Sequence, residues 1–329
     1  MRRFASVAWT FAFSLLPVAQ ALASPPVTVL HPFDLNQGQL PESITADDAG
    51  NLYMTVGGTL QKYTTDHQLV TIARIPLTSE SGAVTLGVKV GPDGYIYVVS
   101  AAFAPAPDAA AIWRVSPAGD VTRFATLAPQ GIPNDLAFDA HEDMYVTDSG
   151  LGRIWKVDAQ GNAQVWFEDP LLLGNPANPI AVVHALGANG IAFDLLRRNL
   201  YVANTDFGRI LRISLHHGQP KGIEVVVTSD LLLGADGIAF DLLGTLYVAV
   251  NASDRIATVR PNGTVSVLVE GGPLDAPSSV VFGTHCGDRR TLFVTNFAIL
   301  RASGVKPGMP QPSLASLPVL VPGLDLDLF

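Results

Sequence analysis

Short apolar segments alternate with polar turns through most of the chain, and one arrangement of them recurs six times. Each copy opens on a stretch such as "PNDLAFD" (133–139), "ANGIAFD" (188–194) or "ADGIAFD" (235–241), and a turn then leads to a second apolar segment such as "NLYVAN". β-Branched and aromatic residues between turn formers are typical of hairpins. Two more short segments follow in most copies, as in "RIWKVDAQG" and "AQVWFED". Each copy therefore predicts four antiparallel strands.

The spacing of these units predicts the fold. Six copies begin near residues 41, 85, 133, 188, 235 and 277, which places them 42 to 55 residues apart. After the first 23 residues, no long segment has the 3.6-residue period of a helix. Units of four strands at this period are blades of a β-propeller. We predict an all-β, six-bladed β-propeller over residues 24–329, closed by strands near 26–33 and 316–323.

The second position of each copy varies in its chemistry, and we call these six positions the slot residues. They are Glu42, Leu86, Asn134, Asn189, Asp236 and Ser278. Because the innermost strands of a propeller line its central channel, side chains at the start of these strands should converge. Two carboxylates and two amide oxygens suit Ca²⁺ or another hard divalent cation, whereas the absence of His and Cys from the slots disfavours Zn²⁺. The competing interpretation is that Asn, Asp and Ser only stabilise turns here.

The N-terminus predicts export. Arg2 and Arg3 precede an apolar run from Val7 to Val18, and Ala21-Leu22-Ala23 is a small-x-small cleavage site. These features are typical of a secretory signal peptide over residues 1–23. The apolar run is short for a membrane span. We therefore expect a secreted or periplasmic protein cleaved after Ala23, with no membrane span after cleavage.

The amino-acid composition limits the classes of molecule that the protein is expected to bind. The chain has 329 residues, 48% of them hydrophobic, and the part after Ala23 carries 18 basic and 29 acidic residues. This acidic balance argues against nucleic acid, whose phosphates need Lys and Arg. The single cysteine, Cys286, cannot form an internal disulfide and is expected to be a buried packing residue. We expect a small-molecule ligand and a monomer or small oligomer.

The six repeats and their slots resemble the senescence marker protein/gluconolactonase group of six-bladed propellers, to which regucalcin-like and diisopropylfluorophosphatase-like proteins are similar. The resemblance spans the chain after the signal peptide. It implies that Glu42, Asn134, Asn189 and Asp236 hold a catalytic Ca²⁺. It also implies hydrolysis of lactones, esters or phosphotriesters. One departure is Ile132, which stands where sugar lactonases often have an arginine.

Several side chains are candidates for catalysis or substrate binding next to the cation. Asp236 would bind the cation and act as general base or nucleophile. Leu86 and Ile132 would make the substrate site apolar, favouring a hydrophobic lactone or ester over a polyol. His184 could assist proton transfer, or be an ordinary loop histidine, and Ser278 could contact the substrate. Two aspartates that follow the second strand of their blades are expected to be turn residues at the opposite end of the blade, Asp148 and Asp206.

Three classes of function remain open from the sequence. The first is an exported Ca²⁺-dependent hydrolase of lactones or related esters. The second is a lyase, cyclase or condensing enzyme similar to strictosidine-synthase-like propellers. The third is a non-catalytic binding propeller, because one fold serves many functions. Four oxygen donors in phase argue against the third class.

Overall fold

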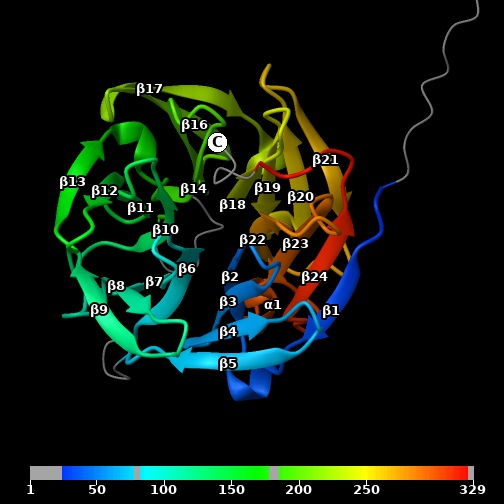
Figure 1. Cartoon of the computed structure of the whole chain (residues 1–329). Helices are drawn as coiled ribbons and strands as arrows, with labels where there is room; N and C mark the ends of the chain where they lie inside the picture. The colour runs from blue at the N-terminus through cyan, green and yellow to red at the C-terminus, as the bar shows by residue number, and fades with distance from the viewer. Residues whose placement is uncertain (1–23, 78–81, 178–184, 325–329) are drawn as a thin grey trace, which may run out of the picture.

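The computed structural model describes residues 24–77, 82–177 and 185–324, and these form six four-stranded antiparallel sheets around a central axis (Figure 1). The predicted six-bladed β-propeller is thereby confirmed. The predicted signal peptide lies outside the described residues and stays a prediction. No helix in the described part of the chain has the length and apolar character needed to cross a membrane.

The first three blades follow the order of the chain, from the innermost strand outward. Their strands are β2 (Pro41–Ala46), β3 (Leu52–Val56), β4 (Thr59–Tyr63) and β5 (Leu69–Arg74); β6 (Val84–Val90), β7 (Ile96–Ala101), β8 (Ala111–Val115) and β9 (Val121–Thr126); and β10 (Pro133–Phe138), β11 (Met144–Asp148), β12 (Arg153–Val157) and β13 (Ala163–Glu168).

The fourth and fifth blades repeat this order, and the sixth closes the ring. Their strands are β14 (Ala188–Phe193), β15 (Asn199–Asn204), β16 (Arg209–His216) and β17 (Gln219–Thr228); β18 (Ala235–Phe240), β19 (Leu246–Val250), β20 (Arg255–Val259) and β21 (Val265–Glu270); and β22 (Pro277–Phe282), β23 (Thr291–Asn296), β24 (Ser313–Pro318) and β1 (Thr28–Pro32). The N-terminal strand is thus the outer strand of the last blade, as the sequence predicts.

In the described parts of the chain, helical segments are short and lie between these strands. They are the 3₁₀ segments η1 (Leu35–Gln37), η3 (Pro170–Leu172), η4 (Asp230–Leu232) and η5 (Asn251–Ser253), and the single-turn helix α1 (Ile299–Ala302). The segment containing α1 joins β23 to β24. Arg301 there contacts Asp254 at 2.8 Å and also pairs with Asp275, so charged groups fix this segment on the fifth and sixth blades.

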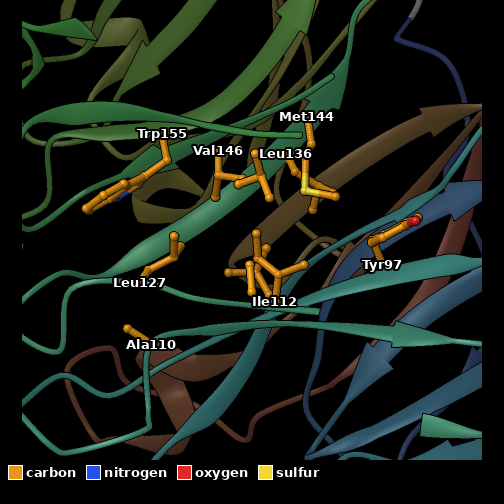
Figure 2. Close-up of a cluster of buried hydrophobic side chains, with 11 residues drawn as sticks. Tyr97, Ala110, Ile112, Leu127, Leu136, Met144, Val146 and Trp155 are labelled. Carbon is orange, nitrogen blue, oxygen red and sulfur yellow. The ribbon is translucent and has the colours of Figure 1, made fainter. Parts of the chain in front are cut away.

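Aromatic pairs join neighbouring blades and explain why the repeated motif keeps its Phe and its Tyr. Phe193 of β14 packs edge-to-face on Tyr145 of the preceding blade, with ring centroids 5.5 Å apart. Phe138 packs in the same way on Tyr97, at 5.4 Å. Figure 2 shows the apolar cluster between the second and third blades, where Ile112, Leu136 and Val146 interdigitate. These contacts supply the burial that holds the ring together.

We predict that Phe193→Ala lowers the free energy of unfolding by about 3–5 kcal/mol, because this side chain is 2% exposed and its removal leaves a cavity between two blades. Urea unfolding followed by far-UV circular dichroism measures the loss. Met309→Ala is the matched control, since Met309 is 83% exposed and its truncation should change the value by less than about 0.5 kcal/mol. Equal losses in the two variants would contradict this role for the interblade pair.

The two ends of the propeller differ in what they carry. At the slot end, each innermost strand begins and each second strand finishes. At the turn end, short turns join the first strand to the second in every blade, and the third strand to the fourth in the first five blades. This antiparallel arrangement corrects one expectation, because Asp148 pairs with Pro133 and therefore lies at the slot end of its blade.

Candidate active site

A β-bulge positions the slot residue in every blade. The ladder between the two inner strands shifts register there, so that Asn134 and Asp135 together face Thr147 in the third blade. The same shift occurs in the other five blades. A bulge places an extra residue opposite a single partner and re-aims its side chain. The slot residue and the residue after it therefore both lie at the channel.

Threonine hydroxyls connect neighbouring bulges at three of the six junctions between blades, through Thr55, Thr147 and Thr295. The Thr147 hydroxyl accepts from the backbone N–H of Asp135 at 3.0 Å and donates to the backbone carbonyl of Asn189 at 2.6 Å. Thr55 donates in the same way to the carbonyl of Leu86 at 2.7 Å. Each threonine thus connects its own bulge to the slot of the next blade. The slot backbone is fixed by structure that does not depend on any ligand.

The four predicted oxygen donors are all buried in the channel. Glu42, Asn134, Asn189 and Asp236 are between 3% and 7% exposed. Glu42 Oε2 and Asn189 Oδ1 have no hydrogen-bond partner. A buried acceptor without a partner costs free energy, and a cation would satisfy it. These orphaned oxygens fit a hard divalent ion.

Two hydroxyls orient the amides so that their oxygens are free. Ser149 donates its proton to the carbonyl of Ala188 at 2.6 Å, so its oxygen can only accept from Asn134 Nδ2 at 3.3 Å. Thr205 likewise donates to the carbonyl of Ala235 at 2.8 Å and accepts from Asn189 Nδ2 at 3.0 Å. In both cases the NH₂ group is held by the protein, which leaves Oδ1 as the atom available to a ligand.

Asp236 is held by a second amide. Asn251 Nδ2 donates to Asp236 Oδ2 at 2.9 Å, which fixes the carboxyl plane and leaves Oδ1 for other partners. Burial raises the pKa of Asp236 to about 8, and the negative charge of Asp135 adds to the rise while the Asn251 hydrogen bond opposes it. The pKa of Glu42 also lies well above its usual range. Burial is the largest cause, and the negative charges of Asp236 and Asp135 raise the pKa further. The site therefore favours either a bound cation or protonated carboxyl groups at Glu42 and Asp236.

Asp135 is a buried carboxyl group that the sequence analysis missed. Its two oxygens accept from the backbone N–H groups of Leu136 at 2.8 Å and Ile191 at 3.2 Å. Burial raises its pKa, whereas the charge of Lys89 and these hydrogen bonds lower it. A signal for it was present in the sequence, because the other residues that follow a slot are only Gly or Ser: Ser43, Gly87, Gly190, Gly237 and Ser279.

Glycine at two of these positions has a steric reason. A Cβ atom added at Gly190 would clash with the backbone carbonyl of Asp236, and one added at Gly87 would clash with that of Asn134. The small residue therefore lets the next blade approach the channel. Asp135 is tolerated where the neighbouring strand supplies N–H donors to its carboxylate.

An apolar cluster lies beside the oxygen ring. Leu86 and Ile132, both buried, contact each other together with Ala101, and the partly buried Phe103 and Leu186 pack against them. The structure thus brings together the two residues that the sequence assigns to an apolar substrate site. Their contact with a substrate stays a prediction.

The remaining candidates have different surroundings. The Ser278 hydroxyl donates to the backbone carbonyl of Glu42 and lies 3.1 Å from the Thr295 hydroxyl, so it joins the sixth blade to the first. Its predicted contact with substrate stays a prediction. His184 lies outside the described residues. Cys286 is exposed, which corrects the expectation of a buried thiol.

Asp148 and Asp206 stabilise loops, as expected of turn residues, but they do so at the slot end. Asp148 is fully buried and accepts from the N–H groups of Ile132 and Leu151 at 2.8 and 3.0 Å. Asp206 accepts from the N–H of Leu186 at 2.7 Å. These carboxylates therefore hold two members of the apolar cluster, Ile132 and Leu186, above the oxygen ring.

A cation at this site would depend on the amides. Within residues 24–77, 82–177 and 185–324, no group of three or more His, Cys, Asp or Glu side chains could hold a metal ion. Two carboxylates and two amide oxygens are nevertheless an ordinary donor set for Ca²⁺, which accepts mixed oxygen ligands and water. Glu42, Asn134, Asn189 and Asp236 fit such an ion.

The fold and this ring of buried oxygens define a six-bladed propeller with a polar site in its central channel. Residues 177–298 match the family model of the SMP-30/Gluconolactonase/LRE-like region, which confirms the resemblance predicted from the sequence. No curated protein matches the chain by sequence.

Solved structures share the fold over most of the chain. A calcium-binding regucalcin from Agrobacterium tumefaciens is 18% identical with a TM-score of 0.66, and the match covers 92% of this chain and 95% of that one. A gluconolactonase from Xanthomonas campestris is 16% identical with a TM-score of 0.61, covering 92% and 91%. Virginiamycin B lyase from Staphylococcus aureus is 14% identical with a TM-score of 0.59, covering 90% and 99%.

Proposed function

We propose that this protein is an exported, Ca²⁺-dependent hydrolase of hydrophobic lactones or related esters. The observation that carries the proposal is the ring of four buried oxygen donors, two of them with orphaned atoms, beside an apolar cluster. Similarity to the gluconolactonase family and to a calcium-binding regucalcin supports the same chemistry. The signal-like N-terminus supports export.

The chain's own residues have separable roles in this proposal. Glu42, Asn134, Asn189 and Asp236 would hold the cation, which when bound supplies Lewis-acid polarisation of a carbonyl oxygen. Asp236 acts as general base or nucleophile through Oδ1, since Asn251 holds its Oδ2. Asp135 contributes to the negative potential that retains the cation.

The apolar cluster selects the substrate. Leu86, Ile132 and Phe103 offer no hydrogen bonds from their side chains, so the hydroxyl groups of a polyol would lose their water without compensation. An alkyl chain would instead be transferred from water to an apolar surface. We therefore place hydrophobic lactones ahead of sugar lactones.

The test is a chelator-controlled screen of lactones, aryl esters and phosphotriesters on the chain from Ser24 to Phe329. Hydrolysis should disappear on chelation and return with Ca²⁺. Hydrolysis that survives both chelation and Asp236→Ala would contradict the proposal. N-terminal sequencing of the exported protein tests cleavage after Ala23.

Substrate preference gives a sharper measurement. We expect kcat/KM for an alkyl-substituted lactone to exceed that for gluconolactone by at least about tenfold, the effect of one or two buried methylene groups. Leu86→Asn should reduce this ratio by about tenfold. Leu173→Asn is the matched control, because Leu173 is 44% exposed and lies outside the cluster. An unchanged ratio in Leu86→Asn would show that the cluster does not contact the substrate.

A lyase or cyclase is the second candidate, favoured by the fold shared with virginiamycin B lyase over 90% of this chain. Product analysis separates the two classes, because a hydrolase incorporates solvent oxygen into its product and a lyase does not. A bound ion without hydrolysis of any substrate would favour the second class.

A further inference from the structure

The turn end of the propeller is divided into two halves of opposite charge. In the first three blades, the six turns that face this end span 47–51, 64–68, 91–95, 116–120, 139–143 and 158–162, and they contain nine acidic residues and neither Lys nor Arg. In the last three blades, the turns at 194–198, 217–218, 241–245, 260–264 and 283–290 contain five arginines and three aspartates. Figure 1 shows the first three blades as one half of the ring and the last three as the other.

Burial sharpens this division. The aspartates of the last three blades turn inward: Asp241 is 2% exposed, and Asp194 is half-buried and caps its own turn. Arg198 and Arg290 are exposed in the same turns. On the other half, Asp48 and Glu142 are exposed. On the acidic half Lys156 pairs with Asp143 at 2.7 Å and Lys89 lines the cavity at this end, but the exposed charged residues of the turns themselves are acidic on one half and arginines on the other.

Leucine side chains are exposed only on the basic half among these turns and the segment 319–324 that crosses them. Leu196, Leu243 and Leu320 are 65%, 72% and 79% exposed. Segment 319–324, which carries Leu320, is bonded to the turn of Leu243 and to the turn at 283–290. The N–H of Leu242 donates to the carbonyl of Pro322 at 3.0 Å, and the N–H of Val319 donates to the carbonyl of Arg290 at 2.8 Å. Leu243 and Leu320 therefore lie on directly bonded segments of the basic half, and an exposed apolar patch of this kind marks an interaction surface.

We infer that this face binds a second copy of the same chain, turn end to turn end, about a two-fold axis parallel to the boundary between the halves. Such an axis places the acidic half of each copy on the basic half of its partner, which is the self-complementarity that a two-fold interface requires. The leucines are removed from water at the same time. An anionic membrane would attract the basic half alone and be repelled by the acidic half.

This association leaves the slot end open. The cavity of about 1000 Å³ at the turn end, which Asp48, Glu142 and Leu324 help to line, is covered in the dimer. The oxygen ring begins at the other end of the inner strands, so substrate access from that end is unaffected. The inference is therefore independent of the proposed function.

The experiment uses two charge-reversed versions of the chain from Ser24 onward. One carries Arg198→Glu and Arg290→Glu, and the other carries Asp48→Lys and Glu142→Lys. Sedimentation equilibrium at low salt should give a dimer for the unaltered chain and a dissociation constant at least about tenfold higher for each variant alone. An equimolar mixture of the two variants should recover the dimer, because a more acidic face then meets a more basic one.

Salt and lipid complete the test. Raising the salt from about 0.05 to 0.5 M should weaken the dimer of the unaltered chain, because these charges are exposed. Circular dichroism of each variant shows whether it folds. A monomer at every salt concentration, a mixture that stays monomeric although both variants fold, or sedimentation of the unaltered chain with anionic phosphatidylglycerol vesicles would overturn the inference.

Discussion

Replacing Asp236 by asparagine should abolish the Ca²⁺-dependent hydrolysis and, at the same time, stabilise the cation-free protein. The lost carboxylate is both a cation ligand and the base or nucleophile of the proposed reaction, so we expect kcat/KM to fall by at least about 10³-fold. The same change removes one of three buried carboxyl groups. After burial itself, the charges of Asp236 and Asp135 raise the pKa of Glu42, and the charge of Asp135 raises that of Asp236.

Thermal unfolding with and without Ca²⁺ measures the second effect. Without the cation, Tm of Asp236→Asn should equal or exceed that of the unaltered protein by a few degrees, about 1 kcal/mol for each 2–4 °C in a chain of this size. With Ca²⁺, only the unaltered protein should gain stability.

Asp241→Asn is the matched control, because Asp241 ends the same "ADGIAFD" motif but caps a turn at the opposite end. It should lose stability and keep its response to Ca²⁺. A metal-free Asp236→Asn protein that is much less stable than the unaltered protein would contradict the description of this group as a buried charge awaiting a cation.

The cation-free protein should lose stability as the pH rises from about 4 to 8. The pKa of Asp236 is raised from 3.8 to about 8 in the folded protein, so within this window the folded state holds a proton that the unfolded state has released. The contribution of Asp236 to stability is therefore largest below the unfolded-state pKa of 3.8 and is fully lost above the folded-state pKa of about 8. Within this window, one such proton lowers the free energy of unfolding by about 1.4 kcal/mol for each unit of rising pH. Glu42, whose pKa is also raised, acts in the same direction.

Tm of the chelated protein across this range measures the effect. Saturating Ca²⁺ should flatten the profile, because cation binding favours the ionised carboxylates that burial alone disfavours. The double variant Glu42→Gln/Asp236→Asn should lose most of this slope without any cation, and Asp135, whose pKa burial also raises, accounts for what remains. A chelated protein whose Tm rises with pH, or a double variant whose slope is undiminished, would contradict this origin of the pH dependence.

Much of the site could be predicted from the sequence because a propeller repeats. The six slots keep the same phase in each copy, so symmetry alone places Glu42, Asn134, Asn189 and Asp236 around one channel. Asp135 was missed because alternation along a regular strand would direct it away from the slot side, and only the bulge brings both residues to the channel. Asp148 lies at the slot end, not at the opposite end that the sequence predicts, because the second strand of each blade runs back toward the slots.

The sequence by itself determined the number of blades, the closure of the ring and the identity of the slot residues, since period-two alternation, turn formers and repeat spacing are all local signals. The tertiary structure decided which atoms of those residues are available. Only the packed ring shows that Ser149 and Thr205 hold the amide NH₂ groups and that Glu42 Oε2 lacks a partner. It also gathers turns far apart in sequence into an acidic half and a basic half. The carbonyls that orient the Ser149 and Thr205 hydroxyls belong to the next blade, and no local sequence pattern encodes such contacts or the burial around them.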